Sequence, residues 1–466
     1  MSLSAVLDRI DADLDPALDR LMAFLRIPSI STDPAYDGDT RRAAAWLRDE
    51  LESLGCSAEL RETTGHPMVV AHTGGEGRPV LFYGHYDVQP VDPIELWHRG
   101  PFDPAIEDQD GARVIRGRGA ADDKGQLMTF VEACRAWKAV HGSLPGNVTF
   151  LFEGEEESGS PSLVPFLEAN REELSKDVAL ICDTGLFARD KPGIVTQLRG
   201  LLGEEVVVKA ASKDLHSGSF GGVATNPIKA LTKILAQLHD DTGRVTIPGF
   251  YDGVPDLPED LRTQWEGLGF DASAFLSGVG LTTPAGETDR TALEQIWSRP
   301  TAEINGIRGG YAGQGFKTVL PAEAAAKISF RLVGQQDPHA IRESFRKMVH
   351  AMLPADCKVE FHDHGASPAS VMNTSDPAFE AARTALSQEW PNEAAYIGAG
   401  GSIPIAGYFQ EILGMDSMLI GFGRDDDQIH SPNEKYDVAS FHRGARSWAR
   451  ILDAISNGQS SSHTQT

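Results

Sequence analysis

Cysteine is scarce in this sequence, and the cysteines that occur are isolated. Cys56, Cys134, Cys182 and Cys357 lie far apart and form no CxxC pair. This usage is typical of buried single thiols in a reducing compartment rather than of a disulfide framework. We therefore expect a cytoplasmic protein without structural disulfides.

The sequence also lacks a membrane-spanning or secretory segment. No stretch approaches the roughly 18 consecutive apolar residues that a membrane-spanning helix needs. Residues 1–31 have no basic region followed by an apolar core, so no signal peptide and no membrane partner are expected. Their apolar side chains recur at helical spacing, which predicts an amphipathic helix. The polar segment 457–466 is expected to be disordered.

Basic residues are outnumbered by acidic ones. The chain has 42 lysines and arginines against 67 aspartates and glutamates, and its formal net charge is −25. Such a surface repels phosphate backbones, so nucleic acid is not an expected partner.

Two domains are expected for a chain of 466 residues, because single cores rarely grow that large. In residues 1–198, short apolar runs such as 80–83 and 148–152 alternate with helical patterns such as 41–54. Alternating strands and helices predict an α/β fold, with a three-layer α/β/α catalytic domain around a mainly parallel sheet.

The pattern changes after residue 198, where an alternating strand pattern is followed by amphipathic helices. We predict a smaller α+β domain at 199–364, inserted between the catalytic parts 1–198 and 365–466. Within it, residues 245–300 are rich in proline, glycine and acidic residues and lack clear periodicity, which predicts an extended loop.

Histidines and carboxylates follow the ends of several predicted strands. The carboxyl ends of parallel strands share one sheet edge, where ligands bind in open α/β sheets. Taken singly, each residue has an ordinary explanation, such as a hydrogen-bonding histidine, a helix N-cap or a solvated acidic run. Crowded at one edge, the charges would repel one another without a cation. Imidazole and carboxylate together suit a divalent metal such as Zn²⁺. The residues concerned are His85, Asp87, Asp122, Glu155, Glu156, Glu157, Asp183 and His430.

Six motifs in chain order extend this interpretation. They are HYDVQP, GRGAADDKG, EGEEESGS, CDTG, DLHSGSFGG and IHSPNE, within residues 80–437. Together they resemble the dizinc exopeptidase family of carnosinase, cytosolic non-specific dipeptidase, glutamate carboxypeptidase and aminoacylase, and most of all its carnosinase and dipeptidase branch. The resemblance implies hydrolysis of dipeptides or small peptides with a free C-terminus. It also implies two divalent metal ions per subunit, with zinc expected and manganese or cobalt as alternatives.

The resemblance also implies which residues bind the metals. His85 and Asp183 match ligands of one ion, and Glu157 and His430 match ligands of the other. Asp122 matches the carboxylate that bridges the two ions.

Further residues of these motifs match roles beside the metals. Asp87 matches a carboxylate that orients a ligand histidine, and Glu156 matches the general base. The base would take a proton from a water that two cations acidify and return it to the leaving amine. Glu155 is expected to be solvated. The Asp122–Asp123 peptide bond is often cis in this family.

The remaining matches lie in the predicted inserted domain or near the C-terminal motifs. His216 matches the donor to the developing oxyanion, which in this family reaches the active site of the other subunit. Arg331 alone would indicate a structural ion pair, but it matches the arginine that holds the substrate α-carboxylate. Thr318 and Ser402 match further polar contacts. The family's Arg-Glu pair before Gly-Gly-Ser is Gly398-Ala399 here, which alters the shape of the pocket.

The inserted domain is also expected to act as a lid that makes a twofold homodimer, as the resemblance implies. A helix around Ile228, Leu231, Ile234 and Leu238, with an edge strand beside it, is the candidate surface.

Two other functions remain open from the sequence. An N-acyl-amino-acid deacylase, of desuccinylase or deacetylase type, would use the same metal chemistry. The insertion at 245–300 and the DLHSGSFGG motif favour a dipeptidase instead. A non-catalytic peptide-binding protein would be expected to lack the base or a ligand, and every matched position is present.

Overall fold

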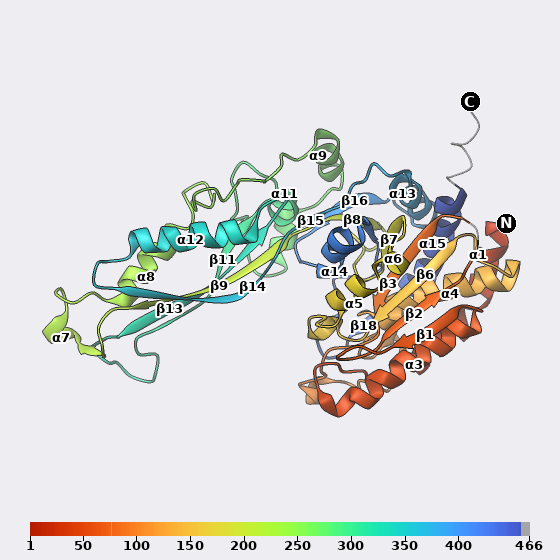
Figure 1. Ribbon diagram of the computed structural model, residues 1–466, viewed down its shortest axis with the longest axis horizontal. Helices are drawn as coiled ribbons and strands as arrows, with labels where there is room; N and C mark the ends of the chain where they lie inside the picture. Colours follow the sequence, from red (N-terminus) through yellow and green to blue (C-terminus); the bar gives the residue numbers. More distant parts are fainter. Residues whose placement is uncertain (76, 458–466) are drawn as a thin grey trace. The chain divides into compact units, whose positions relative to one another are not determined.

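The structure is a computed structural model that describes residues 1–75 and 77–457. The predicted disorder at 457–466 therefore falls, beyond Asn457, outside the described residues. The chain divides into two compact units, drawn in Figure 1. Unit 1 comprises Met1–Thr196, Met372–Ile397 and residues 408–457, and unit 2 comprises Gln197–Val371 and Gly398–Gly407.

Three short segments group with unit 2, although the expected boundaries placed them in the catalytic parts 1–198 and 365–466. Two of them are residues 197–198 and 365–371, and the longest is Gly398–Gly407. Two hydrogen bonds hold it there. Ser402 Oγ donates to Arg199 O (2.5 Å), and Arg199 Nε donates to Gly400 O (2.9 Å).

Unit 1 is built on a twisted sheet with the order β1-β2-β6-β3-β7-β17-β8, and the short strand β15 (Ser370–Val371) extends this order beyond β8. Its central strands β6, β3, β7 and β17 are parallel, and its outer pairs are antiparallel. β16 pairs with β8, and a smaller sheet has the order β18-β5-β4. The strands are β1 (Ser57–Arg61), β2 (Met68–His72), β3 (Pro79–His85), β4 (Ala105–Gln109), β5 (Ala112–Arg116), β6 (Asn147–Glu153), β7 (Val178–Ile181), β8 (Gly193–Leu198), β16 (Ala395–Ala399), β17 (Ser417–Leu419) and β18 (Lys435–Asp437).

Helices cover both faces of this sheet. They are α1 (Leu3–Ala12), α2 (Leu14–Leu25), α3 (Asp37–Ser53), α4 (Lys124–His141), α5 (Leu163–Ala169), α6 (Arg171–Leu174), α13 (Pro377–Glu389) and α15 (Val438–Asn457), with the short turns η1 (Pro34–Tyr36), η2 (Ile94–Leu96), η3 (Glu156–Ser158) and η4 (Phe409–Leu413). The short helix α14 (Pro404–Tyr408) begins in the segment Gly398–Gly407 of unit 2. Successive side chains of a strand point to opposite faces. On β3, Phe82 packs on Phe130 of α4, and Tyr83 packs on Phe409 of η4. This three-layer arrangement confirms the predicted fold class.

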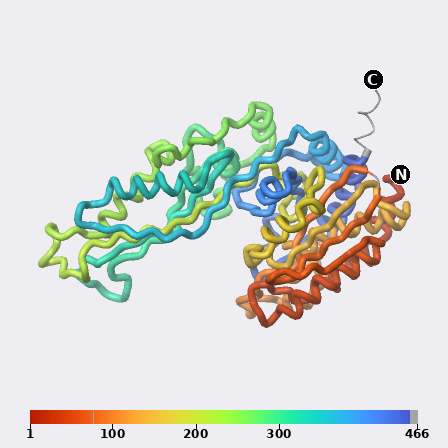
Figure 2. Tube along the Cα trace, viewed as in Figure 1, coloured from red at the N-terminus to blue at the C-terminus, as the bar shows by residue number. Residues whose placement is uncertain are grey.

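The predicted N-terminal helix is broken into α1 and α2. Proline has no N–H group, so Pro16 cannot donate to the carbonyl of Ala12 and continue the first helix. Pro16 is tolerated in the first turn of α2, where backbone N–H groups have no partner within the helix. Figure 2 shows the N-terminal helices and the last helix, α15, in the same unit, and α1 contacts α15 and α4.

Unit 2 contains an antiparallel sheet with the order β11-β13-β9-β14, and α8 and α12 contact it. Its strands are β9 (Gly200–Lys209), β10 (Leu215–His216), β11 (Thr301–Gly309), β12 (Val319–Leu320), β13 (Glu323–Leu332), β14 (Lys358–Ser367) and β15 (Ser370–Val371). Its helices are α7 (Ser217–Phe220), α8 (Pro227–Leu235), α9 (Glu259–Glu266), α10 (Ala272–Ser277), α11 (Ala292–Trp297) and α12 (Pro338–Met352).

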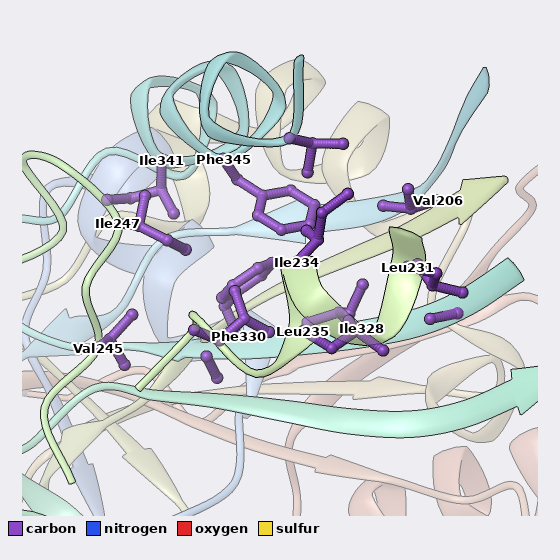
Figure 3. Packing of buried hydrophobic residues seen from close by; sticks show 14 of the residues in the cluster. Val206, Leu231, Ile234, Leu235, Val245, Ile247, Ile328, Phe330, Ile341 and Phe345 are labelled. Atoms are coloured by element: carbon purple, nitrogen blue, oxygen red, sulfur yellow. The ribbon is translucent and has the colours of Figure 1, made fainter. Parts of the chain in front are cut away.

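The prediction that the apolar face of α8 forms part of a dimer surface is wrong. Leu231, Ile234 and Leu238 are buried in the core of unit 2 together with Phe330 and Phe345. Figure 3 shows Leu231 and Ile234 within this core. Ile228 is partly buried against the same core. The apolar stripe of α8 therefore packs on its own sheet, and the edge strand is left as the candidate surface.

The extended loop predicted at 245–300 is also wrong in part. Three short helices, α9, α10 and α11, lie within it, and Trp265 and Trp297 pack edge to face with ring centroids 4.9 Å apart. Helices of eight residues or fewer complete too few turns to give a clear apolar period.

Among the described residues, no helix combines the length and the apolar composition that a membrane-spanning helix needs.

Candidate metal centre

Three parallel strands bring their carboxyl ends to one place in unit 1. His85 is the last residue of β3 and pairs with Glu153, the last residue of β6. Glu156 and Glu157 follow β6 in the turn η3, and Asp183 follows β7. These residues therefore lie together at the carboxyl ends of the parallel strands, as the sequence predicts.

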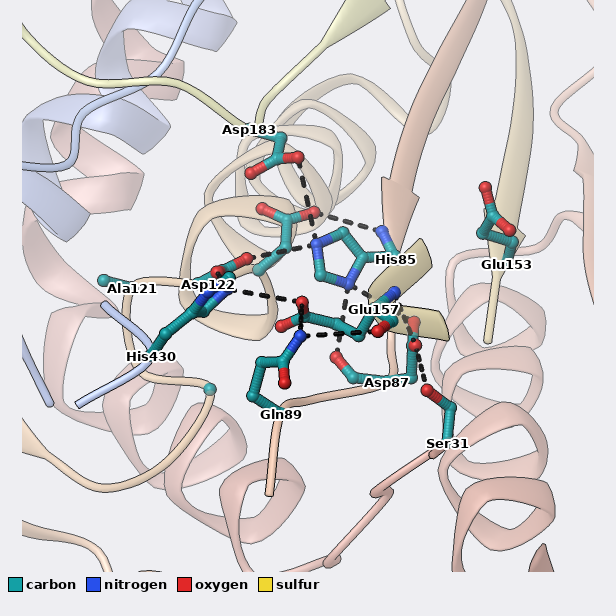
Figure 4. A network of polar contacts seen from close by, with 12 residues as sticks. Ser31, His85, Asp87, Gln89, Ala121, Asp122, Glu153, Glu157, Asp183 and His430 are labelled. Atoms are coloured by element: carbon teal, nitrogen blue, oxygen red, sulfur yellow. Dashed lines mark hydrogen bonds and ion pairs between the residues drawn. The ribbon is translucent and has the colours of Figure 1, made fainter. Parts of the chain in front are cut away.

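The first candidate metal cluster contains His85, Asp122 and Asp183. One ligand atom from each lies within 4.8 Å of the others. His85 Nε2 is 3.2 Å from Asp122 Oδ1 and 3.9 Å from Asp183 Oδ2. Figure 4 shows the three side chains turned toward one another. The His85 side chain is fully buried.

The second cluster contains Asp122, Glu157 and His430. His430 Nε2 lies 2.8 Å from Asp122 Oδ2 and 3.3 Å from Glu157 Oε2. Gln89 Nε2 donates to Glu157 Oε2 (2.8 Å) and fixes that carboxylate. Asp122 therefore offers one oxygen to each cluster, and the peptide bond that follows it is cis.

Asp87 contacts a ligand residue of each cluster, His85 of the first and Glu157 of the second. Its Oδ1 lies 3.3 Å from His85 Nδ1, on the side of the ring opposite Nε2. Its Oδ2 accepts hydrogen bonds from Ser31 Oγ (2.6 Å) and from the backbone N of Glu157 (3.0 Å). This arrangement orients the imidazole and fixes the turn that carries Glu157.

The charges of the site are poorly balanced by the protein alone. Burial, together with repulsion from Asp122, raises the pKa of Asp183 well above its usual range. Burial opposes ionisation of Asp122 too, but hydrogen bonds from His430 and His85 hold the pKa of Asp122 well below its usual value. Burial and the carboxylates of Glu157 and Asp87 raise the pKa of Glu156.

Divalent cations fit these residues. Within the described part of the chain, His85 Nε2 and Glu157 Oε1 are buried atoms without a hydrogen-bond partner. A cation in each cluster would ligate them and offset the repulsion among the carboxylates. Imidazole nitrogen with carboxylate oxygen is a ligand set that zinc accepts.

Glu155 differs from its predicted solvated state. It is buried, and its carboxylate accepts hydrogen bonds from the backbone N atoms of His66 and Ser162, both at 3.1 Å. Ser162 directly precedes α5, so Glu155 fixes the chain at the start of that helix. In a run of three glutamates, the sequence gives no signal that separates it from its neighbours.

Glu434 is a residue of the site that sequence reasoning missed, although it stands in the IHSPNE motif. It is fully buried, and its carboxylate accepts four hydrogen bonds from the segment that leads into Asp122. The donors are Arg118 Nη1 (2.7 Å) and the backbone N atoms of Gly119 (3.0 Å), Ala121 (2.8 Å) and Asp122 (3.1 Å). Because Glu434 follows His430 by four residues, it ties the His430 loop to the Asp122 loop.

The Glu434→Gln variant should bind divalent metal about 10- to 100-fold more weakly, which is typical when a group that supports metal ligands is lost. An amide turns an N–H group toward backbone donors and so displaces Asp122. Competition with a chelator measures the affinity. Glu389→Gln is the matched control, because this carboxylate, on α13, is also buried and pairs with Arg446 (2.7 Å) and Arg450 (2.8 Å). Native metal affinity in Glu434→Gln would contradict the role given to Glu434.

Unit 2 holds the other four predicted site residues in two pairs. The first pair, His216 and Thr318, is exposed, and Ser217 N donates to Thr318 O (3.0 Å) beside it. His216 Nδ1 accepts from Gly218 N (3.0 Å), so Nε2 is the ring nitrogen that carries a proton in the neutral form.

The second pair lies at the other end of β13. Arg331 Nη1 donates to Ser402 Oγ (3.2 Å). Arg331 stands eight residues along β13 from Glu323, which is roughly 26 Å at about 3.3 Å per residue. His216 and Thr318 adjoin β12, just before the Glu323 end. The two pairs therefore lie at opposite ends of unit 2, and Figure 1 shows α7 beyond the far end of its sheet.

Comparison with known proteins gives consistent matches over nearly the whole chain. Residues 81–454 match the family described as peptidase family M20/M25/M40. The Cys-Gly metallodipeptidase DUG1 of Saccharomyces cerevisiae is 30% identical, with 98% of each chain covered. The human Beta-Ala-His dipeptidase is 29% identical, covering 97% of this chain and 92% of that protein.

Solved structures agree in fold. The dipeptidase Dug1p from Saccharomyces cerevisiae superposes with a TM-score of 0.78 at 29% identity, covering 98% of this chain and 99% of the other. The M20 family metallo-carboxypeptidase Sso-CP2 from Sulfolobus solfataricus gives a TM-score of 0.80 at 32% identity, covering 95% and 99%.

Proposed function

The chain belongs to peptidase family M20/M25/M40, and on that premise we propose that it is a metal-dependent dipeptidase that cleaves peptides with a free C-terminus. Family membership confirms the resemblance and the prediction of an enzyme. The observation that carries the proposal is the pair of ligand clusters that share Asp122 at the strand ends. Relatives named as dipeptidases favour this function over an N-acyl-amino-acid deacylase.

The proposed site holds two divalent ions, zinc by preference and manganese or cobalt as alternatives. When bound, the ions supply Lewis-acid chemistry that polarises the scissile carbonyl and acidifies water. His85, Asp122 and Asp183 would hold one ion, and Asp122, Glu157 and His430 would hold the other.

The protein's own groups move the proton and bind the developing charge. The Glu156 carboxylate would accept the proton of the attacking water and deliver it to the leaving amine nitrogen. His216 would donate its Nε2 proton to the developing oxyanion, since its Nδ1 already accepts a hydrogen bond. Arg331 would hold the substrate α-carboxylate, with Ser402 and Thr318 as further polar contacts.

Metal reconstitution tests the proposed function. Protein stripped of metal should lose activity and recover it with one or more of zinc, manganese and cobalt. A panel of dipeptides should then be cleaved in preference to N-acetyl and N-succinyl amino acids. The opposite preference would identify a deacylase, and metal binding without turnover of either class would leave only a binding protein.

A homodimer is part of the proposal, because the two pairs in unit 2 cannot serve one dipeptide within a single chain. An extended dipeptide spans only about 7 Å, whereas β13 separates Arg331 from the His216 end by roughly 26 Å. If both pairs contact one substrate, they come from different subunits.

The edge strand β11 offers a symmetric way to achieve this. It lies at one edge of the four-stranded sheet, and it exposes Ile304 (41%) and Ile307 (57%). Two copies pairing antiparallel about their centres would bring the Gly309 end of one strand to the Thr301 end of the other. Thr301 is the register partner of Arg331, so the partner subunit's tip would approach the carboxylate-binding end.

Arg331→Lys should raise KM about 10- to 100-fold for dipeptides with a free C-terminus, because an ammonium group cannot replace the two-pronged guanidinium. Amidated dipeptides should already be poor substrates of the native enzyme. Steady-state kinetics on matched free and amidated peptides measure both effects. Equal cleavage of the two by the native enzyme would remove Arg331 from this role.

A further inference from the structure

Two arginines of unit 2, Arg199 and Arg331, line one cavity of about 790 Å³. Arg331 Nη1 donates to Ser402 Oγ (3.2 Å), and Arg199 Nε donates to Gly400 O (2.9 Å). Within residues 1–75 and 77–457, no carboxylate oxygen lies within 4.0 Å of either guanidinium. Both side chains are half-buried.

The two positive charges act on each other. Burial and then the charge of Arg331 lower the pKa of Arg199 to about 10. Glu303 also lines the cavity and partly offsets this effect, but it forms no ion pair with either arginine. Two half-buried like charges are unfavourable side by side unless an anion lies between them.

A third arginine in the same cavity provides a contrast. Arg299 is satisfied within the chain, since its Nε and Nη2 donate to the two carboxylate oxygens of Glu287 (2.7 and 3.1 Å). Arg199 Nη2 and the Nε and Nη2 atoms of Arg331 have no hydrogen-bond acceptor among the residues that the structure describes. Three donors therefore remain for a ligand at this end of the cavity.

The backbone around Arg199 keeps its guanidinium in place. Ser402 Oγ, which accepts from Arg331, donates in turn to Arg199 O (2.5 Å). Gly400 has no side chain, and a Cβ atom there would lie only 3.0 Å from Arg199 Nη2. The glycine therefore leaves room for a second guanidinium beside Arg331.

We propose that Arg199 and Arg331 together bind the C-terminal carboxylate of the peptide substrate. The inference rests on the proposed peptidase function and adds a second cation to its carboxylate site. A carboxylate accepts several hydrogen bonds at its two oxygens, so two guanidinium groups can share it.

The test compares alanyl-alanine with alanyl-alanine amide as substrates of the metal-loaded enzyme. Arg199→Gln should raise KM for the free acid on the order of 10- to 100-fold, with kcat little changed. The preference for acid over amide should fall by a similar factor, because the amide carries no charge to lose. Arg299→Gln is the matched control from the same cavity and should keep the native preference.

The possible outcomes separate the two ideas. If the native enzyme cleaves neither peptide, the proposed function fails. If the native enzyme prefers the free acid and Arg199→Gln keeps that preference, Arg199 only supports the Gly400 backbone and the inference is overturned. Should Arg199→Gln fail to fold, Arg199→Met tests the same point, since it keeps the length of the side chain and removes the charge. A native preference in Arg199→Met would overturn the inference equally.

Discussion

Glu156→Gln should lower kcat by roughly 10²- to 10⁴-fold, the range typical of a lost general base. The amide has nearly the shape of the carboxylate but cannot accept the proton of the attacking water. Glu156 belongs to neither ligand cluster, so the variant should hold as much metal as the native protein. Turnover of a simple dipeptide and metal content measured on the same sample give both quantities.

Glu157→Gln is the matched control for this prediction. It is the same substitution one residue along the turn η3, but Glu157 belongs to the cluster of Asp122 and His430. It should therefore lose metal, and excess metal should restore part of its activity. Near-native turnover by Glu156→Gln, or loss of metal equal to that of Glu157→Gln, would remove Glu156 as the base.

The grouping of the candidate metal ligands could be predicted in part, because several of them stand at or just after strand ends. His85 ends one strand and Asp183 follows the parallel strand beside it, so recognising the strands places the two residues near each other. The sequence alone does not identify Asp122 as a metal ligand, because an aspartate at a helix start is equally typical of an N-cap. Its position between two histidines follows only from the way its loop folds.

Residues that support the site through tertiary contacts could not be predicted. Glu434 acts on a segment more than three hundred positions earlier in the chain, and no local period or turn signal records such a contact. Arg199 is notable because no carboxylate among the described residues forms an ion pair with it, which only three-dimensional packing reveals. The apolar stripe of α8 could not be interpreted from the sequence either. An apolar helix face is compatible both with a subunit interface and with packing in the core of the same domain.

Mixing two inactive variants, His216→Ala and Glu156→Gln, should restore activity if His216 serves the partner's site. A mixed dimer would contain one site with both defects and one site with neither. At random exchange, half of the dimers are mixed, and each has one intact site of two. Activity should therefore rise toward roughly a quarter of the native value for independent sites.

The structure supports this expectation through the separation of roughly 26 Å along β13 between the His216 end and Arg331. Each variant alone should bind metal normally, since neither residue belongs to a ligand cluster. Subunit exchange must be monitored independently, for example with differently labelled chains. As a control, Arg331→Gln with Ser402→Ala should not restore activity, because these residues contact each other and belong to the same end of unit 2. If the subunits of the His216→Ala and Glu156→Gln variants exchange fully and activity does not recover, His216 acts within its own chain. The dimer would then have no role in catalysis.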